Sequence, residues 1–212
     1  MIHSQNCLRT GSCWCEVKRY GLILAVGALI LAGELAGGYL SGSLALMADA
    51  FHVAIDGGAV VIAIAIAVSV RKRPEREALM IRRKGTGIQA ALMIVIVVGI
   101  VSEALRRLEH PVEIQSMTML GTAILGAVGN YIQHWMLRKT EAGDDANITR
   151  RALDRHILSD LAQSIAVIAG GIVIAVTGWF WVDPLLSLGV AALMGYWAIH
   201  IIRDGAEPHH HP

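Results

Sequence analysis

Residues 44–70 read LALMADAFHVAIDGGAVVIAIAIAVSV, and only three side chains in this run, Asp49, His52 and Asp56, can carry a charge. A helix that crosses the hydrocarbon layer of a membrane needs about 20 mostly apolar residues, so this run is long enough to cross. Five further runs along the chain have the same character. The six predicted spans are 20–40, 44–70, 88–105, 117–137, 153–177 and 184–202. The sequence therefore predicts an all-α membrane protein with six transmembrane helices.

The composition of the whole chain leads to the same class. Of its 212 residues, 55% are hydrophobic and 17% are charged, whereas a soluble domain is about 45–50% apolar and about 25% charged. One soluble globule of this size is therefore excluded. The formal net charge of +1 gives no reason to expect a nucleic-acid partner, and lipid is the surrounding that the composition predicts.

The distribution of basic residues predicts the orientation of the spans. Lys and Arg are retained on the cytoplasmic side of membrane proteins. Here they gather before the first span, between the second and third, between the fourth and fifth, and after the sixth, whereas the other loops hold only Arg106 and Arg107. Both termini are therefore predicted to be cytoplasmic. The predicted organisation is a cytoplasmic tail over 1–19, a transmembrane domain over 20–203 and a short cytoplasmic tail over 204–212.

Two spans carry the same pair of polar residues at the same spacing. His52 and Asp56 lie four residues apart in the second span, and His156 and Asp160 repeat this spacing in the fifth. Residues four apart share one face of a helix. Because the two spans run in opposite directions, packing them together places His52 beside Asp160 and Asp56 beside His156. Asp56 is 12 residues from the outer end of its span and Asp160 is 17 from the outer end of its own, so helix tilt or an inward-open cavity is needed to bring them level.

The donor atoms of these two pairs suit a divalent metal. Two imidazole nitrogens and two carboxylate oxygens form a set that Zn²⁺ binds tetrahedrally, whereas Mg²⁺ and Ca²⁺ prefer six or more oxygens. The absence of thiolates from the set disfavours Cu(I), and two carboxylates neutralise the charge of the ion. The alternative interpretation is that each pair is a structural polar contact between helices.

The same stretches resemble a known family. SLALMADAFHVAID at 43–56 resembles the second-helix signature of the cation diffusion facilitator family, and HILSD at 156–160 with WVDP at 181–184 resembles its fifth helix and the following turn. Residues 103–108, Pro111 and Asn130 fit its third and fourth helices. The resemblance implies metal ligands of the zinc type, and carried over by position these are His52, Asp56, His156 and Asp160.

The resemblance also implies a function. It predicts efflux of Zn²⁺ from the cytoplasm by alternating access, in exchange for protons, across the cytoplasmic (inner) membrane of a prokaryote, with no resident cofactor. Proton exchange agrees with the chemistry, because metal ligands must be deprotonated and the ordinary pKa of histidine is about 6.5. The alternative cargoes are Cd²⁺, Co²⁺ and Fe²⁺. Members of the family are usually homodimers with a further cytoplasmic domain; here only 204–212 follow the sixth span, so a dimer would form through the membrane helices.

Two other classes of protein are alternatives to a transporter. A membrane metalloenzyme is disfavoured because no H-E-x-x-H motif occurs and four protein ligands leave no open position for water. A metal-binding membrane protein or channel without proton coupling is the remaining alternative, although a channel usually needs weak and multiple sites.

The two ends of the chain and the second span contain weaker candidates for metal binding. Cys7, Cys13 and Cys15 in the N-terminal tail could capture zinc, although incidental thiols in a tail are the plainer interpretation. The histidines at 209–211 could bind metal weakly or be a low-complexity end. Asp49 lies three residues before His52 and could orient it as an outer partner.

Three further carboxylates lie within the spans, and Asp154 in the fifth is one of them. Glu34 in the first span and Glu103 in the third are expected to be helix-packing or outer-vestibule residues rather than ligands.

Overall fold

The computed structural model describes residues 14–70, 74–138 and 148–206. Within these ranges the chain forms six α-helices and no strand, which confirms the all-α prediction. The helices are α1 (Trp14–Ser41), α2 (Leu44–Val70), α3 (Glu75–Glu109), α4 (Ser116–Arg138), α5 (Ile148–Thr177) and α6 (Val182–Ala206). Each predicted span falls inside one of these helices.

The helices begin earlier than the apolar runs do. α3 starts at Glu75, well before the predicted start at 88, and α1 starts at Trp14 rather than at 20, inside the predicted tail. The stretch after Pro74 is rich in charged residues, so its hydropathy is too low for it to be included in the predicted span at 88–105. Glu, Arg, Lys, Ala, Leu and Met are nevertheless strong helix formers. The apolar run therefore marks the part of α3 that suits a membrane, and the helix continues beyond it.

Four helices in the described part of the chain are long and apolar enough to cross a membrane. Their crossing segments are Gly21–Ser41, Lys84–Glu109, Leu153–Thr177 and Val182–Arg203. α2 and α4 pack in the same bundle, and α4 is more polar because it carries Asn130, Gln133 and His134. Large apolar side chains such as Leu29 and Val95 are exposed on the outside of the bundle, as contact with lipid requires.

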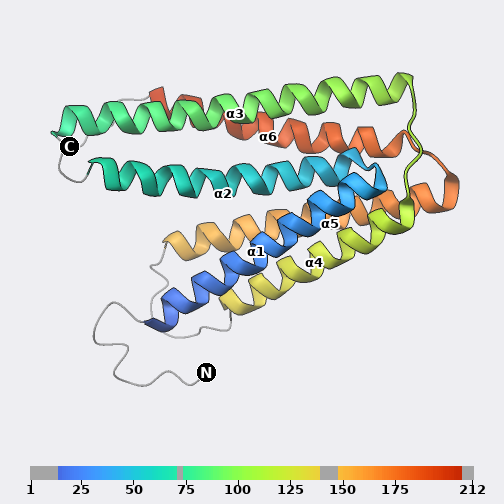
Figure 1. The fold of residues 1–212 in the computed structure, drawn as a ribbon, viewed down its shortest axis with the longest axis horizontal. Coiled ribbons are helices and arrows are strands. Elements are labelled where there is room, and N and C mark those ends of the chain that lie inside the picture. The colour runs from blue at the N-terminus through green and yellow to red at the C-terminus, as the bar shows by residue number, and fades with distance from the viewer. Residues whose placement is uncertain (1–13, 71–73, 139–147, 207–212) are drawn as a thin grey trace.

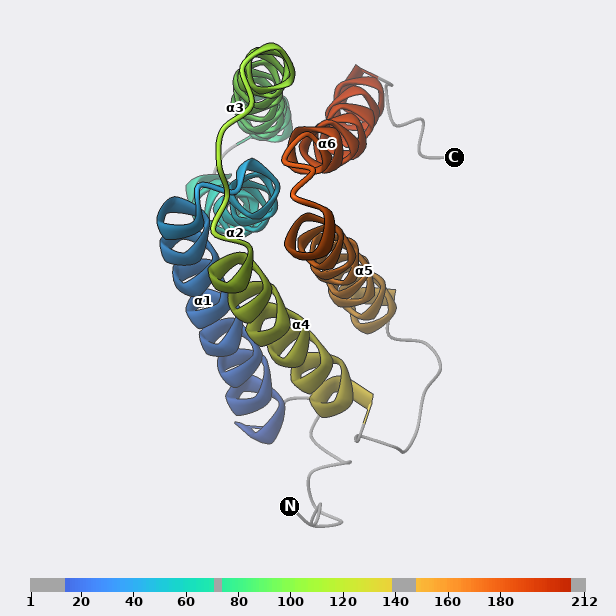
Figure 2. The same cartoon turned by 90° about the vertical axis from the view of Figure 1, so that its right-hand side faces the viewer.

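α2 lies at the centre of the fold (Figures 1 and 2). α3 and α6 pack together on one side of it, and α1, α4 and α5 pack together on the other. One apolar cluster joins Ile55 of α2 to Met194 of α6. A second cluster joins Leu46 of α2 to Met119 of α4 and Val167 of α5. The polar residues of α2 are therefore held between the two halves of the molecule.

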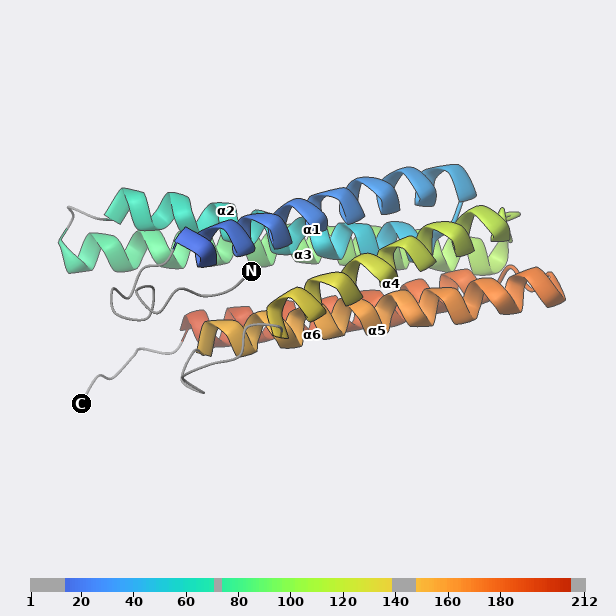
Figure 3. The same ribbon diagram turned by 90° about the horizontal axis from the view of Figure 1, so that it is seen from below.

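α2 and α5 run in opposite directions, and α5 reaches further at one end. The turn between α5 and α6 lies beyond the turn between α1 and α2 (Figures 1 and 3). Because of this offset, Asp160 can lie level with Asp56 although Asp160 is 17 residues from the outer end of its span and Asp56 is 12 residues from the outer end of its own. The start of α1 and the end of α6 lie at the same end of the bundle. We call this the inner end, following the sequence-based orientation, and the opposite one the outer end.

Asp183, at the start of α6, binds the start of α2 at the outer end. Its side chain is fully buried. It accepts hydrogen bonds from Ser43 Oγ at 2.6 Å, from the backbone N–H of Leu44 at 2.8 Å and from that of Ala45 at 3.2 Å. Arg107 Nη1 of α3 lies 3.8 Å from the same carboxylate. Asp183 thus caps a helix other than its own, and we call this arrangement the Asp183 latch.

The close approach of α1 and α4 depends on a glycine. A Cβ on Gly37 would meet the side chain of Thr122, whose own Cβ would be 2.7 Å away, and the Thr122 hydroxyl is held by a hydrogen bond to the carbonyl of Thr118. We expect Gly37→Ala to destabilise the protein by about 1–3 kcal/mol through overpacking. The thermal midpoint of the detergent-solubilised protein measures this.

The matched control for this substitution is Gly33→Ala, one turn earlier on α1. A Cβ on Gly33 would meet nothing within 4 Å, so this change is expected to leave the midpoint unchanged or to raise it, because alanine favours helix by about 0.5–1 kcal/mol over glycine. Equal shifts for the two variants would contradict the close approach of α1 and α4.

Candidate metal centre

The four residues of the repeated motif meet between α2 and α5. His52 Nε2 lies 3.6 Å from Asp56 Oδ2 and 4.0 Å from Asp160 Oδ1. His156 Nε2 lies 3.6 Å from Asp56 Oδ2 and 3.5 Å from Asp160 Oδ2. The side chains therefore form a closed ring in which imidazole and carboxylate alternate. We call this ring the His–Asp quartet.

The size of the ring can be compared with a tetrahedral site. Zinc bonds of 2.0–2.2 Å place neighbouring ligand atoms about 3.3–3.6 Å apart, and the four edges of the quartet measure 3.5–4.0 Å. Within the residues that the structure describes, no group of three or more His, Cys, Asp or Glu side chains is placed closely enough to hold a metal ion. The quartet is wider than a tetrahedral zinc shell, although its shortest edge lies within the range of one.

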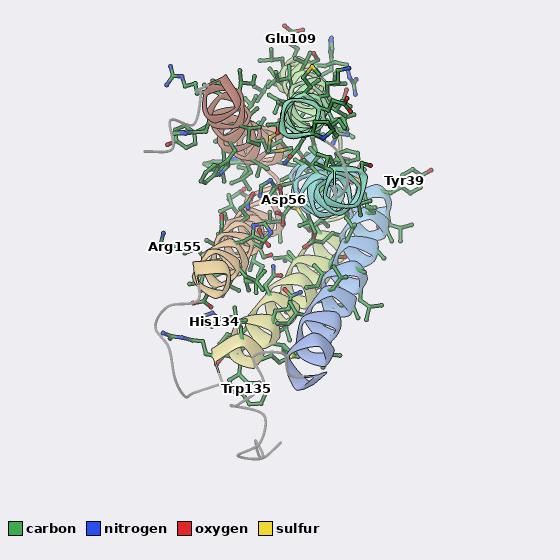
Figure 4. The ribbon with its side chains drawn as sticks, turned by 90° about the vertical axis from the view of Figure 1, so that its left-hand side faces the viewer. Tyr39, Asp56, Glu109, His134, Trp135 and Arg155 are labelled. Carbon is green, nitrogen blue, oxygen red and sulfur yellow. The ribbon has the colours of Figure 1, made fainter. Side chains whose placement is uncertain are left out.

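The quartet is more accessible from the inner end than from the outer end. The side chains of His52 and Asp160 are only 5% and 9% exposed, whereas those of Asp56 and His156 are 26% and 38% exposed. The more exposed pair lies nearer the end of α2 and the start of α5. Figure 4 shows Asp56 directed into the space between the helices, whereas Arg155 points away from it. The half of the ring that lies nearer the inner end is thus the more exposed half.

Asp49 was considered as a residue that could orient His52 by a hydrogen bond, and the structure does not contain this hydrogen bond. Its side chain is buried, and its Oδ1 has no hydrogen-bond partner among the described residues. Nδ1 of His52, the atom that an outer partner would orient, also lacks a partner there. The structure therefore gives no hydrogen bond through which Asp49 orients His52.

Glu34 and Glu103, two further carboxylates within the spans, have different surroundings. Glu34 does not lie in an outer vestibule, because it is only 1% exposed and its Oε1 lies against Gly126 of α4. Glu103 accepts hydrogen bonds from Arg106 and Arg107 near the outer end of α3, which agrees with a helix-packing role.

One polar contact that sequence analysis missed lies nearer the inner end. His134 Nδ1 of α4 and Asp154 Oδ1 of α5 are 2.7 Å apart. No regular spacing connects these two residues in the sequence. Of the weaker candidates, Cys7, Cys13 and the histidines at 209–211 lie outside the described residues, and the side chain of Cys15 is not described either.

Comparisons with known proteins bear on this site. The sequence model described as "Cation efflux transmembrane domain" matches residues 21–207. A protein of Yersinia pestis named zinc transporter ZitB is 39% identical over 191 residues, which are 88% of this chain and 61% of that protein. ZitB of Escherichia coli (strain K12) is 33% identical over 196 residues, covering 91% of this chain and 62% of the relative.

A more distant relative has a broader name. The "Cadmium, cobalt and zinc/H(+)-K(+) antiporter" of Bacillus subtilis (strain 168) is 32% identical over 202 residues, covering 90% of this chain and 64% of that protein. The chain thus spans less than two thirds of the length of these curated relatives.

Proposed function

Because this chain belongs to the cation efflux family, whose members are transporters rather than enzymes, we propose that it carries a divalent metal cation, with Zn²⁺ as its main cargo, out of the cytoplasm. The matched domain is a transmembrane one and the relatives are bacterial, so the protein is a multi-pass inner-membrane protein. The observation that supports the proposed cargo most directly is the ring of alternating imidazoles and carboxylates between α2 and α5.

In this proposal the His–Asp quartet is the transport site. His52 and His156 supply nitrogen ligands, and Asp56 and Asp160 supply oxygen ligands and cancel the double charge of the ion. Burying an unpaired charge in surroundings of low dielectric constant is costly. The two carboxylates make the complex with the metal ion neutral and so avoid this cost. Cd²⁺ and Co²⁺ suit the same mixed donor set, and two relatives are named for transport of these metals as well as zinc.

The unequal exposure of the quartet supports an inward-facing state. The ring opens toward the inner end, and the Asp183 latch and the apolar cluster around Leu46 lie between the ring and the outer end. The basic residues of the sequence assign the inner end to the cytoplasm. Metal therefore enters from the cytoplasm in this state, and release requires a second state that opens outward.

We propose that the transport is coupled to protons. A metal ion binds only deprotonated imidazole and carboxylate groups, so protons and metal compete for the same atoms. Two relatives are named as H(+)-K(+) antiporters. We also propose a homodimer formed through the membrane helices, for which the apolar outer face of α3, with Leu92 and Val95 exposed, offers a surface.

The proposed coupling predicts the direction of the pH effect on flux. Vesicles that contain the protein and have an acidic lumen in neutral buffer should accumulate radioactive zinc, since protons leave as zinc enters. Each proton exchanged is expected to raise the equilibrium accumulation about tenfold per pH unit, because one pH unit corresponds to 1.36 kcal/mol per proton. Zinc uptake is measured with and without a protonophore. Uptake that is the same with and without the pH gradient would favour a channel and contradict antiport.

A further inference from the structure

The seam between α2 and α5 continues outward beyond the His–Asp quartet. Outward from the inner half of the quartet, the residues along this seam follow spacings of four, three and four on both helices. Residues with these spacings share one stripe of a helix, so the two stripes can face each other along the seam. In outward order, the stripe of α2 consists of Asp56, His52, Asp49 and Ala45, and that of α5 consists of His156, Asp160, Gln163 and Val167.

Contacts at two levels fix the register of the two stripes. His52 and Asp160 face each other in the quartet, with Nε2 and Oδ1 4.0 Å apart. Further out, Ala45 and Val167 belong to the same apolar cluster. The helices run in opposite directions and the steps along them are equal, so one facing pair falls between these two levels. This pair, which we call the outer pair, consists of Asp49 and Gln163.

Both members of the outer pair are buried, and both have polar atoms without a partner. Asp49 is 2% exposed and Gln163 is 9% exposed. Among the described residues, neither Oδ1 of Asp49 nor either amide atom of Gln163 has a hydrogen-bond partner. Buried polar groups in proteins are almost always hydrogen-bonded, and exceptions indicate water or an ion. The outer pair therefore receives a polar guest.

The position of the outer pair indicates where such a guest comes from. The quartet lies on its inner side, and the apolar cluster that contains Ala45, Leu46 and Val167 lies on its outer side. An ion that leaves the quartet toward the outer end thus passes between Asp49 and Gln163 before it reaches the apolar cluster. The outer pair therefore lies on the route that efflux requires.

The chemistry of the outer pair gives a weaker hold on a metal ion than that of the quartet. Asp49 supplies one carboxylate and Gln163 one carboxamide, whereas the quartet supplies two carboxylates and two imidazoles. Imidazole suits zinc, whereas carboxylate, carbonyl and water oxygens suit harder cations. One carboxylate also cancels only half of the charge of a divalent ion. A zinc ion can therefore leave the outer pair more readily than it leaves the quartet.

We propose that Asp49 and Gln163 form an exit site, which receives the divalent metal ion from the quartet when the protein opens outward. This inference rests on the proposed efflux. The carboxylate of Asp49 binds the ion, and water molecules that the ion gains on leaving the quartet fill its remaining positions. One of these water molecules donates a hydrogen bond to Gln163 Oε1. The exit site thus lets the ion exchange protein ligands for water in two steps.

The test uses the full chain in vesicles and the variants Asp49→Asn and Gln163→Leu. We expect either variant to lower the maximal rate of zinc uptake by about 10–100-fold, the range found when a partner next to a metal ligand is lost. The affinity for zinc, measured by calorimetry in detergent, should not change, because the quartet is loaded first. The visible absorption spectrum of bound Co²⁺ should also stay as in the unsubstituted protein, since it reports the geometry of the quartet.

Two matched substitutions serve as controls. Asp154→Asn changes a carboxylate that contacts His134 rather than the seam. Gln133→Leu removes another buried glutamine, whose Nε2 donates a hydrogen bond of 2.8 Å to the carbonyl of Ile23. Both control variants should keep the uptake rate of the unsubstituted protein when the rate is expressed per amount of folded protein.

A third variant gives a readout that a role in helix packing would not change. Gln163→Glu places a second carboxylate opposite Asp49, so the outer pair can neutralise a divalent ion of its own. Paired metal sites in proteins hold their ions as little as about 3.5–4 Å apart, so both sites can be filled together. Equilibrium dialysis against Zn²⁺ should find one more ion per chain in this variant than in the unsubstituted protein.

The possible results separate the exit site from the function on which it rests. A wild-type protein that takes up no zinc would contradict the proposed efflux itself. If the wild type takes up zinc and the Asp49 and Gln163 variants match the control variants, the exit site is overturned and efflux stands. A changed Co²⁺ spectrum would assign the outer pair to support of the quartet and overturn it too. So would the lack of an additional ion in Gln163→Glu, which decides alone if Asp49→Asn and Gln163→Leu do not fold.

Discussion

Asp160→Ala is expected to abolish zinc uptake and to lower the affinity for metal at least about 100-fold. Asp160 contacts both histidines of the quartet, and without it one carboxylate is left to balance a doubly charged ion in a buried site. Loss of an outer partner of a metal ligand already costs about 10–100-fold in affinity, so loss of a ligand costs at least as much. Calorimetric titration with Zn²⁺ and uptake by vesicles measure the two effects.

The same substitution at two other positions of α5 provides the comparison. His156→Ala should weaken binding less, because this side chain is 38% exposed and water can take the vacated position. Asp154→Ala removes a carboxylate that contacts His134 rather than the quartet and should leave metal affinity nearly unchanged. If the Asp160→Ala protein bound zinc as tightly as the Asp154→Ala protein, the quartet would be a structural contact between helices and not a metal site.

Asp183→Ala should be the most destabilising single substitution at the outer end. It leaves the Ser43 hydroxyl and the backbone N–H groups of Leu44 and Ala45 without their acceptor, in a buried position. It also removes the carboxylate that lies 3.8 Å from Arg107 Nη1, although Arg107 keeps its ion pair with Glu103. Removing one partner of a buried charged network destabilises a protein by about 3–5 kcal/mol. Denaturation of the detergent-solubilised protein, followed by tryptophan fluorescence, gives the value.

Two controls identify the source of this loss. Asp183→Asn keeps an oxygen that can accept from Ser43 or Leu44 but removes the charge, so it should be less destabilising than Asp183→Ala. Glu113→Ala removes an exposed carboxylate from the α3–α4 connection at the same end and should have little effect. Equal destabilisation by the Asp183 and Glu113 substitutions would show that the Asp183 latch contributes nothing to stability.

The helices and the quartet could be found from the sequence for physical reasons. A chain inside lipid must satisfy its own backbone hydrogen bonds, so a long apolar run can only be a helix there. A repeated spacing of four then places His52 with Asp56, and His156 with Asp160, on single helix faces. α3 begins earlier than the predicted span at 88–105, because hydropathy reports only the part of a helix that suits lipid. The charged residues after Pro74 are good helix formers that continue the same helix.

The rest of the site depends on contacts that no local pattern encodes. Asp183 and Leu44 are 139 positions apart, and Asp183 directly precedes Pro184, so the sequence suggests an ordinary helix start rather than the cap of another helix. Glu34 was expected to be a helix-packing or outer-vestibule residue, and the structure buries it. Its position between α4 and α5 depends on the space left by Gly126, which becomes evident only when the helices are packed.

The gradient of exposure across the quartet has a kinetic consequence. In the proposed function, a hydrated cation that arrives from the inner end meets Asp56 and His156 first and His52 and Asp160 last. It must therefore shed its shell of water in stages. Zn²⁺ accepts this exchange into a four-ligand site, whereas Mg²⁺ dehydrates reluctantly and demands octahedral oxygen. In this proposal Mg²⁺ is delayed at the entrance, and discrimination between the two ions begins before all four ligands have made contact.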